Sequence, residues 1–370
     1  MRLNRLVVVL AMVASLALLV AACGDDNSGS GNGGGGGASN SGSKQLSGSI
    51  AGAGSSAQDA AMQAWIAGFQ DSNPDATVSY DPVGSGGGRE QFVAGGVDFA
   101  GSDSPLADEE LTGAQKRCGG ADNLVEIPVY VSPIAIIYNL EGVDNLQLSP
   151  ETAAKIFKQE ITNWNDPAIA KDNPGAKLPD QRISPVNRSD ESGTTENFTD
   201  YLSQAAPSVW TFEPDGNWPV KGGEAAEGTS GVVDAVKAGK GTIGYADESQ
   251  AGELGIAKIK IGSEYVAPSA EAAAAILDKS KESDDPGQYV FTYDLDRKVK
   301  GTYPITLTSY QIACTKYSSA DKGALVKGLL SYVVSPEGQD AAAKNAGSAP
   351  ISDALRQKIQ PAVEAIGSGS

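Results

Sequence analysis

The sequence predicts an α/β fold with largely parallel sheets. From Ser49 onward, short runs rich in β-branched residues alternate with segments whose apolar residues recur at helical spacing. Two of the strand-like runs, 125–139 and 303–316, are long and almost wholly apolar. Strands that alternate with helices usually pair in parallel, because each helix carries the chain back to the same edge of the sheet.

The individual elements follow from these patterns. In the first helix the apolar positions Ala60, Ala61, Ala64, Trp65 and Phe69 form one face. The predicted strands are 47–53, 76–80, 97–100, 125–139, 241–245 and 303–316. The predicted helices are 57–71, 89–94, 152–158, 232–238, 267–278 and 319–334, and another begins at Asn197. The glycine-rich stretch 84–88 is predicted to be a turn between a strand and a helix.

The N-terminus predicts export and membrane attachment. A basic start, Met1–Arg5, precedes an apolar run over 6–20 that is too short to span a bilayer and is typical of a signal peptide. Small residues lead directly to Cys23, as in a bacterial lipobox, so we expect residues 1–22 to be removed and Cys23 to be lipidated. Residues 23–45 would then tether the protein to the extracytoplasmic face of the cell membrane. An ordinary signal peptide with an incidental cysteine is the alternative.

Charge and composition exclude several classes of function. The net charge is −18 at pH 7, which argues against nucleic acid as a partner. The chain has no histidine, which removes Ser-His-Asp and Cys-His catalysis and imidazole metal sites. A small anion is not excluded, because local donors can outweigh the field of the whole chain in an enclosed site. We therefore expect no metal and no cofactor.

Two further cysteines, Cys118 and Cys314, follow the lipobox cysteine. In an exported protein a pair of cysteines favours a disulfide over two free thiols. The sequence does not fix the distance between the two residues, so the disulfide is a prediction from cellular compartment and count alone.

The segment 188–195 predicts an anion-binding site. It places the Arg188 guanidinium, several hydroxyl groups and Gly193 directly before the helix expected at Asn197. The unpaired N–H groups and the dipole of a helix N-terminus attract anions, and a glycine lets a ligand approach the backbone. Arg188 adds a planar, permanently charged fork that suits a tetrahedral oxyanion. We expect Asp190 to hold Arg188 in orientation, although an exposed turn aspartate would have the same sequence context.

Hydroxyl-bearing residues occur at four places where a predicted strand gives way to a turn or a helix. These places are Ser55–Ser56, Ser85, Ser102–Asp103 and Ser192–Thr194. In open α/β sheets ligands gather outside the carboxyl ends of strands, so four such turns together predict one shared site. Asp103 taken alone would also suit a helix cap.

Two glycine-rich segments do not match nucleotide-binding motifs. The spacing in 84–88 differs from a dinucleotide fingerprint, and taken alone this segment would be a flexible loop. Around 238–241, Asp234 stands where a phosphate loop has its first glycine, and Gly241 stands where it needs Ser or Thr. Trp164 is predicted to be a packing residue rather than a ligand contact.

Six segments together resemble a known family, the phosphate-binding lipoproteins of bacterial high-affinity phosphate ABC transporters (the PstS family). They occur in order, the resemblance covers residues 48–355, and they are specific as a set rather than singly. The segments are 51–56 (AGAGSS), 84–88 (GSGGG), 97–103 (VDFAGSD), 161–167 (ITNWNDP), 188–194 (RSDESGT) and 241–245 (GTIGY).

The resemblance implies a two-domain, type II periplasmic-binding-protein-like fold with a hinged cleft between the domains. Domain I would comprise residues 46–131 plus 304–370, and domain II residues 132–303, with the two long strands crossing between them. Phosphate would lie in the cleft. The matched contact positions are Ser56, Ala57, Ser85, Asp103, Arg188, Ser192, Gly193 and Thr194, with Asp190 behind Arg188.

The resemblance also implies the partners. The protein would deliver inorganic phosphate to the membrane permease subunits of an ABC importer, without catalysis, as a monomer anchored through Cys23. The family often has glycine where this chain has Glu191. A carboxylate facing a bound anion would be unfavourable, so we expect Glu191 to point to solvent.

Selectivity would depend on Asp103. An ionised carboxylate only accepts hydrogen bonds, and phosphate near neutral pH keeps a proton to donate, whereas sulfate does not.

Three alternative functions stay open. The first is a phosphatase, which would need an activated nucleophile or a metal cluster. The second is a receptor for an unprotonated oxyanion such as sulfate or molybdate, which Asp103 disfavours. The third is a surface adhesin, which would not need hydroxyls at four turns.

Overall fold

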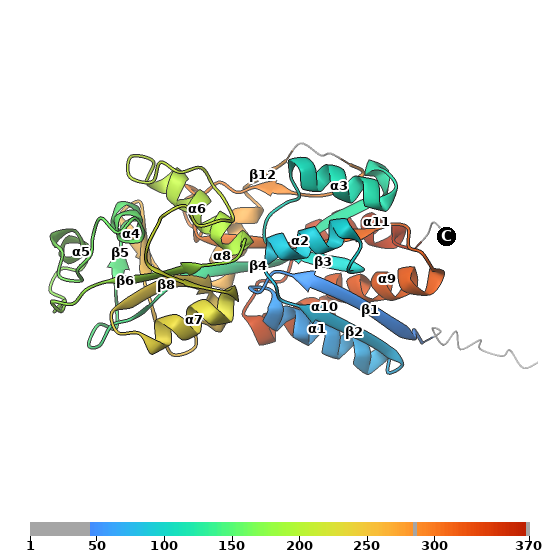
Figure 1. Cartoon of the computed structure of the whole chain (residues 1–370), viewed down its shortest axis with the longest axis horizontal. Coiled ribbons are helices and arrows are strands. Elements are labelled where there is room, and N and C mark those ends of the chain that lie inside the picture. Colours follow the sequence, from blue (N-terminus) through green and yellow to red (C-terminus); the bar gives the residue numbers. More distant parts are fainter. Residues whose placement is uncertain (1–44, 284–286, 368–370) are drawn as a thin grey trace, which may run out of the picture. The chain divides into compact units, whose positions relative to one another are not determined.

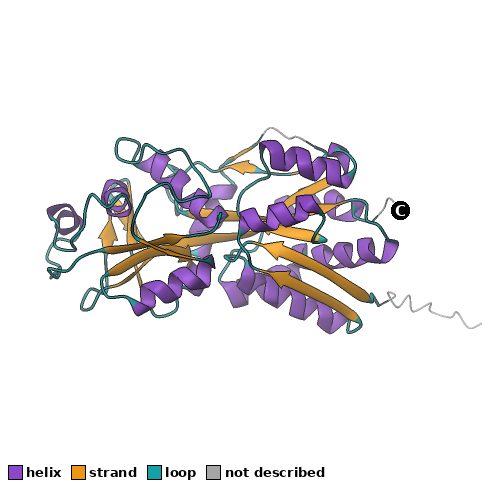
Figure 2. Ribbon diagram, viewed as in Figure 1, coloured by secondary structure: helices purple, strands orange, loops and turns teal. Residues whose placement is uncertain are grey.

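The structure, a computed structural model, describes residues 45–283 and 287–367. The predicted signal peptide, the lipobox cysteine Cys23 and nearly all of the predicted tether lie outside these residues. The described part is an α/β fold built on a long sheet (Figures 1 and 2), with the strand order β2-β1-β3-β15-β4-β8-β6-β7. None of its helices has the length and apolar character needed to cross a membrane.

One end of this sheet comes from the N-terminal part of the chain. Its strand β1 pairs in parallel with both β2 and β3, as the alternation of strands and helices predicts. Of the predicted apolar face of the first helix, Ala61, Trp65 and Phe69 are buried, and Ala60 and Ala64 are partly buried. The elements are β1 (Gly48–Gly54), α1 (Asp59–Ser72), β2 (Ala76–Asp81), α2 (Ser85–Ala94), β3 (Phe99–Ser102) and α3 (Asp108–Cys118).

The other end of the sheet comes from the middle of the chain. Strand β6 pairs in parallel with both β8 and β7, and helix α7 packs along β8 and β6. The elements are α4 (Pro150–Phe157), α5 (Pro167–Asp172), β6 (Ser184–Arg188), α6 (Gly193–Ala205), β7 (Glu224–Ala226), α7 (Gly228–Ala238) and β8 (Thr242–Asp247).

The two long apolar runs are strands β4 (Leu124–Asn139) and β15 (Thr306–Cys314) at the centre of the sheet. The first part of β4 pairs with β15, and its last part, from Ile134 onward, pairs with β8. Strand β4 therefore belongs to both ends of the sheet (Figure 1). Strand β15 runs antiparallel to β3 and β4, and β4 also runs antiparallel to β8, so the expectation of largely parallel pairing fails at the centre. The short strand β13 (Tyr289–Val290) pairs with β4 in parallel.

Three helices after β15 complete the described fold. Helices α10 and α9 pack against α1, and α11 packs against α9. The first of these helices, α9, was predicted from the sequence, whereas α10 and α11 were not. The remaining elements are η1 (Ala121–Asn123), β5 (Gln147–Leu148), η2 (Glu248–Gln250), β9 (Gly255–Ile256), β10 (Lys258–Ile261), β11 (Glu264–Val266), α8 (Ala270–Leu277), β12 (Lys281–Glu282), β13 (Tyr289–Val290), β14 (Tyr293–Asp294), α9 (Ala320–Val334), α10 (Pro336–Ala346) and α11 (Asp353–Ala365).

The glycine-rich stretch 84–88 is mostly helix, contrary to the prediction of a turn. Helix α2 begins at Ser85 and includes three consecutive glycines, which have low helix propensity. Close packing explains them: a Cβ on Gly88 would lie 2.8 Å from the carbonyl oxygen of Ala53. Only glycine lets this first turn approach the end of β1 so closely.

Trp164 has the predicted packing role. Its side chain is fully buried, and the indole N–H donates to the carbonyl oxygen of Gly241 at 3.0 Å. This hydrogen bond satisfies the polar end of a large apolar side chain inside the core.

The disulfide between Cys118 and Cys314 is present, which confirms the prediction. It joins the end of α3 to the end of β15, with the two Cα atoms 5.2 Å apart across 196 residues of sequence. A covalent link across so long a stretch of chain restricts the unfolded ensemble strongly.

Removing this disulfide is expected to destabilise the protein without abolishing the fold of the site. The double variant Cys118→Ala/Cys314→Ala should lower the free energy of unfolding by about 2–5 kcal/mol. Urea titration of the variant measures this loss, and the unmutated protein in excess reductant is its control. Two free thiols in the purified, unreduced protein would contradict the disulfide.

A carboxyl group, Glu126 on β4, is completely buried within the fold. Its Oε1 accepts a hydrogen bond from the N–H of Leu106 at 2.9 Å, and its Oε2 has no partner among the described residues. Burial raises the pKa of Glu126 from 4.5 to about 8, because the charged form is poorly solvated there. The folded protein therefore holds a proton here that the unfolded chain releases above pH 4.5.

This proton makes stability depend on pH. The contribution of Glu126 is fully present below about pH 4.5 and is lost as the pH rises towards 8. When the pH rises from 6 to 9, the free energy of unfolding should decrease less in Glu126→Gln than in the unmutated protein. The two decreases should differ by about 2–3 kcal/mol. Asp247, a second buried carboxyl with a raised pKa, is unchanged in both proteins, so their difference reports Glu126. Equal pH dependence in the two proteins would contradict the buried protonated carboxyl.

Candidate functional site

The residues predicted to bind an anion come together between the two ends of the sheet, and each is almost fully enclosed. They lie where β1 and β3 end, where β6 ends, and where α2 and α6 begin. None is more than 7% exposed. Their exposures are Ser56 7%, Ala57 0%, Ser85 1%, Asp103 3%, Arg188 3%, Ser192 1% and Thr194 1%, and Gly193 is also buried.

Asp103 is the centre of one group of contacts. Its Oδ2 accepts a hydrogen bond from the Thr194 hydroxyl at 3.1 Å, and its Oδ1 accepts one from Ser309. Its backbone N–H donates to the Ser85 hydroxyl at 3.1 Å. A Cβ on Gly193 would lie 2.7 Å from the Cβ of Asp103 and 2.8 Å from the Ser85 hydroxyl oxygen. The start of α6 therefore lies directly against Asp103 and the start of α2.

Arg188 and Asp190 form the ion pair that the sequence predicts. The Nε of Arg188 donates to Asp190 at 2.7 Å, and its Nη2 also contacts this carboxylate. Asp190 accepts a further bond from the N–H of Gly228 at 3.0 Å. Burial alone would raise the pKa of Asp190, but Arg188 and this N–H hold it below its ordinary value. Nη1 of Arg188 donates to no described residue and is free to meet a ligand.

Ser56 lies against helix α7. Its hydroxyl oxygen accepts a hydrogen bond from the N–H of Thr229 at 3.0 Å and lies 3.1 Å from the Thr229 hydroxyl. Gln250 donates to the carbonyl oxygen of Ser56 at 3.0 Å and to that of Ala57 at 3.3 Å. These contacts join the loop after β1 to elements from the other end of the sheet.

Several backbone N–H groups in the site donate to no described residue. They belong to the loop after β1 and to the first turns of α2 and α6, and they are Ala57, Ser85, Gly193 and Thr194. A buried N–H without a partner is costly, so such a cluster fits a ligand that offers several acceptor oxygens. The dipoles of two helix N-termini add positive potential at the same place.

Helix α6 begins at Gly193, earlier than the predicted start at Asn197. Ser192 is its N-cap, and the Ser192 hydroxyl accepts from the N–H of Thr195 at 3.2 Å. The Thr195 hydroxyl lies 2.7 Å from that of Tyr245, which also accepts from the N–H of Arg188. Ser192 therefore shapes the helix start, and its hydroxyl proton is still available to a ligand.

The site contains one net negative charge, because Asp190 neutralises Arg188 and Asp103 stands alone. Burial raises the pKa of Asp103, while the hydroxyls of Ser309, Ser55 and Thr194 and the charge of Arg188 pull it down. Each carboxylate oxygen has two lone pairs, so Asp103 can accept another hydrogen bond at either oxygen. A ligand would thus meet many donors and one strong acceptor.

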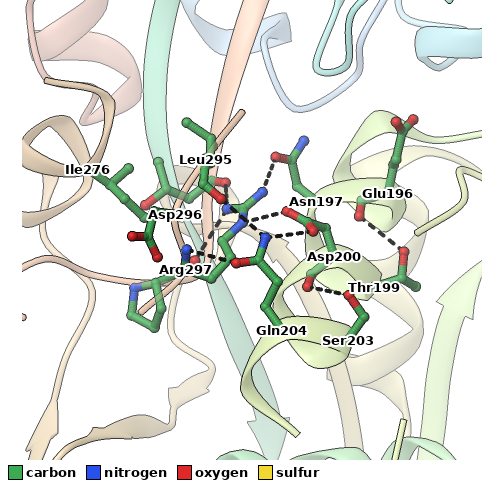
Figure 3. A network of polar contacts seen from close by, with 12 residues as sticks. Glu196, Asn197, Thr199, Asp200, Ser203, Gln204, Ile276, Leu295, Asp296 and Arg297 are labelled. Atoms are coloured by element: carbon green, nitrogen blue, oxygen red, sulfur yellow. Dashed lines mark hydrogen bonds and ion pairs between the residues drawn. The ribbon is translucent and has the colours of Figure 1, made fainter. Parts of the chain in front are cut away.

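Asn197 connects this site to a second polar network, which is centred on Arg297 (Figure 3). The Asn197 amide donates to the backbone carbonyl of Asp103 at 2.7 Å, and its oxygen accepts from Arg297 at 2.6 Å. Arg297 also pairs with Asp200 at 2.8 Å and donates to the backbone carbonyls of Pro304 and Thr306 around the start of β15. This network ties α6 to the central strand and to the Asp103 loop.

A cavity of about 440 Å³ lies beside this network and is bordered by Asp103, Asn197, Arg297 and Tyr310. Its wall carries more carboxylates than cations, since Glu196, Asp200 and Asp294 also border it. The residues with free N–H groups, Ala57, Ser85, Gly193 and Thr194, do not border this cavity.

Several residues of the site were not predicted from the sequence. Ser309 comes from the middle of an apolar strand, and Asn197 was predicted only as the start of a helix. Thr229 and Gly228 begin α7 in a Gly-Thr-Ser-Gly segment, which resembles the other hydroxyl-bearing helix starts. That repeated pattern was the one local signal that could have located them.

Glu191 is exposed, as expected, and it also has a partner that was not expected. Its side chain is 45% exposed, and its Oε1 lies 2.7 Å from Nη2 of Arg89 on helix α2.

The hydroxyls of Thr194 and Ser309 donate to Asp103, and the chain has no histidine that could activate a hydroxyl group. Within the described residues there is also no group of three or more Asp, Glu, Cys or His side chains that could hold a metal ion.

Comparison with known proteins agrees with this fold. A family model described as a PBP superfamily domain matches residues 39–337, which places the chain in that superfamily. Phosphate-binding protein PstS 3 of Mycobacterium tuberculosis is 37% identical over 378 residues, which cover 99% of this chain and 100% of that protein. The PstS 3 protein of Mycobacterium leprae is 36% identical over 374 residues, with the same coverage. The chain belongs to the PstS family.

A solved structure has the same fold at lower sequence identity. It is a high affinity periplasmic phosphate-binding protein, PfluDING, bound with phosphate. The TM-score is 0.68 at 23% identity, and the match covers 85% of this chain and 93% of that one.

Proposed function

We propose that this protein is an extracytoplasmic receptor that captures inorganic phosphate in the enclosed site and delivers it to an ABC importer. The observation that carries the proposal is the setting of Asp103: a buried carboxylate that forms no ion pair with a described residue and lies among free N–H groups and hydroxyls. Membership of the PstS family supports the same ligand, since the relatives are named phosphate-binding proteins.

Recognition would work by matching hydrogen bonds. Nη1 of Arg188, the free N–H groups and the hydroxyls of Ser56, Ser85 and Ser192 would donate to the phosphate oxygens. The P–OH group would donate to Asp103, which already accepts from the Thr194 hydroxyl. Burial raises the pKa of Asp103 and so makes it a stronger acceptor. Sulfate has no proton for this position and would place a bare oxygen against a carboxylate, which costs several kcal/mol.

Binding would be coupled to closure of two domains, residues 46–131 plus 304–370 and residues 132–303. The pairing of β4 with β15 in its first part and with β8 in its last part supports this division. The site residues come from both sides of it, so separating the sides would open the site. Closure would exclude water and mark the loaded state for the permease.

Delivery requires the protein to stay near the membrane. The lipobox-like sequence before Cys23 and the Gly- and Ser-rich segment after it support a lipid anchor and a flexible tether. We infer that the receptor works as a monomer, with the permease subunits as its protein partner.

The purified protein should carry its ligand. Acid denaturation of protein purified without added phosphate is expected to release about one phosphate per chain, as measured by a colorimetric assay. A chain that releases none, and that binds none after refolding, would contradict the proposal. Release of p-nitrophenol from p-nitrophenyl phosphate would instead favour the phosphatase alternative.

A further inference from the structure

Arg89 is a second buried guanidinium beside the site, and it is held by groups from both ends of the sheet. It lies on α2 with a side chain 5% exposed. Its Nε contacts Glu110 at 2.7 Å, and its Nη1 donates to the hydroxyls of Ser102 at 3.0 Å and Ser104 at 2.9 Å. Its Nη2 contacts Glu191 at 2.7 Å. With these partners Arg89 is committed to protein contacts rather than to a ligand.

Glu191 also fits the surface of α2 closely. Its backbone carbonyl accepts from the N–H of Gly86 at 3.2 Å. A Cβ on Gly86 would lie 2.5 Å from Cδ of Glu191, so the glycine makes room for this side chain. The contact therefore consists of an ion pair, a backbone hydrogen bond and a shaped surface.

The partners of Arg89 come from different sides of the site. Glu110 and the two serines belong to the end of the sheet that contains β1 and β3, as does Arg89 itself. Glu191 belongs to the loop between β6 and α6, next to Asp190 and Ser192. Separating the two sides would break only the link to Glu191, and Arg89 would keep Glu110 as its counter-ion.

The geometry points to Glu191 and Arg89 as a latch that holds the site closed around its ligand and slows release. This inference rests on the proposed phosphate binding and adds an affinity-determining pair that does not touch the anion. A contact made only in the closed form raises the closed population and therefore the apparent affinity. Because the contact forms after the ligand has entered, it should act mainly on the dissociation rate.

The latch is tested with Glu191→Gln, which keeps the size of the side chain and removes its charge. Phosphate-loaded protein is mixed with excess of a fluorescent phosphate-binding reporter, and the rate of phosphate transfer is followed by stopped flow. We expect dissociation to be about two- to fivefold faster in Glu191→Gln, with little change in the association rate. Glu90→Gln, an exposed charge removal on the same helix, is the matched control and should dissociate like the unmutated protein.

Two further measurements sharpen the test. Added NaCl should speed dissociation from the unmutated protein more than from Glu191→Gln, because only the former has the ion pair to screen. Gly86→Ala, which favours the helix but crowds Glu191, should also dissociate faster. Equal rates in Glu191→Gln and the unmutated protein would overturn the latch while leaving phosphate binding intact. Failure of the unmutated protein to bind phosphate would be seen separately, in the titration of that protein alone.

Discussion

Replacing Arg188 by alanine is expected to abolish tight phosphate binding. The dissociation constant should rise about 10²- to 10³-fold, because a buried, hydrogen-bonded charge is lost from an anion site. The loss has two parts. The phosphate would lose the one cationic donor, Nη1, and Asp190 would stand buried without its partner and add repulsion.

Two variants separate these effects from simple misfolding. Arg188→Lys keeps the charge but cannot hold Asp190 and a phosphate oxygen with one planar fork, so it should bind with intermediate affinity. Arg182→Ala removes an exposed arginine just before the same strand and should bind normally. Titration calorimetry on all three, with circular dichroism as the folding control, measures the series. Tight binding by a folded Arg188→Ala protein would contradict the assigned role.

Replacing Asp103 by asparagine should change which anion is bound. The introduced amide would offer a donor where the carboxylate offers only acceptors, so the penalty against an unprotonated oxyanion disappears. We expect the preference for phosphate over sulfate to fall by at least about 100-fold, through weaker phosphate binding and new sulfate binding. Thr194 and Ser309 donate to different oxygens of Asp103, so in the variant one hydroxyl can still donate to the amide oxygen and the other can turn to accept from the amide N–H; the loop should therefore keep its conformation.

The matched control is Asp81→Asn, which removes an exposed carboxylate at the end of the neighbouring strand β2. It changes the net charge by the same amount and should leave selectivity unaltered. Competition of each variant with phosphate and sulfate gives the ratio directly. A selectivity ratio unchanged in Asp103→Asn would show that another group rejects sulfate.

Helices and strands could be predicted where the sequence pattern of the segment itself determines its structure. The buried face of α1 and the two long apolar strands follow directly from spacing and β-branched composition. The direction of β15 was not predictable in the same way. Its antiparallel pairing depends on where the chain returns to the sheet, which is a property of the whole topology.

Helix starts were predicted too late at two turns of the candidate site. Ser85–Gly88 and Gly193–Thr195 look like loop sequences because glycine and hydroxyl residues have low helix propensity. In the structure these residues form the first turns of α2 and α6, where close packing requires small side chains. Tertiary contacts therefore override propensity at the places where function is expected.

The residues of the candidate site that belong to recognisable sequence motifs could be predicted. Arg188 with Asp190, and Asp103 after a strand, are visible in the sequence. Ser309 is not, because it comes from a buried strand 206 residues away from its partner. The exposure of Glu191 was predicted, but its ion pair with Arg89 was not, because Arg89 lies far from it in the sequence.

An enclosed site with one buried, unpaired carboxylate should select a protonated oxyanion. This selectivity is tested by titrating the ligand-stripped, unmutated protein with phosphate and with sulfate, near neutral pH and in the same buffer. We expect tight binding of about one phosphate per chain and no measurable heat with sulfate. Equal affinity for the two anions, or binding of sulfate alone, would contradict it.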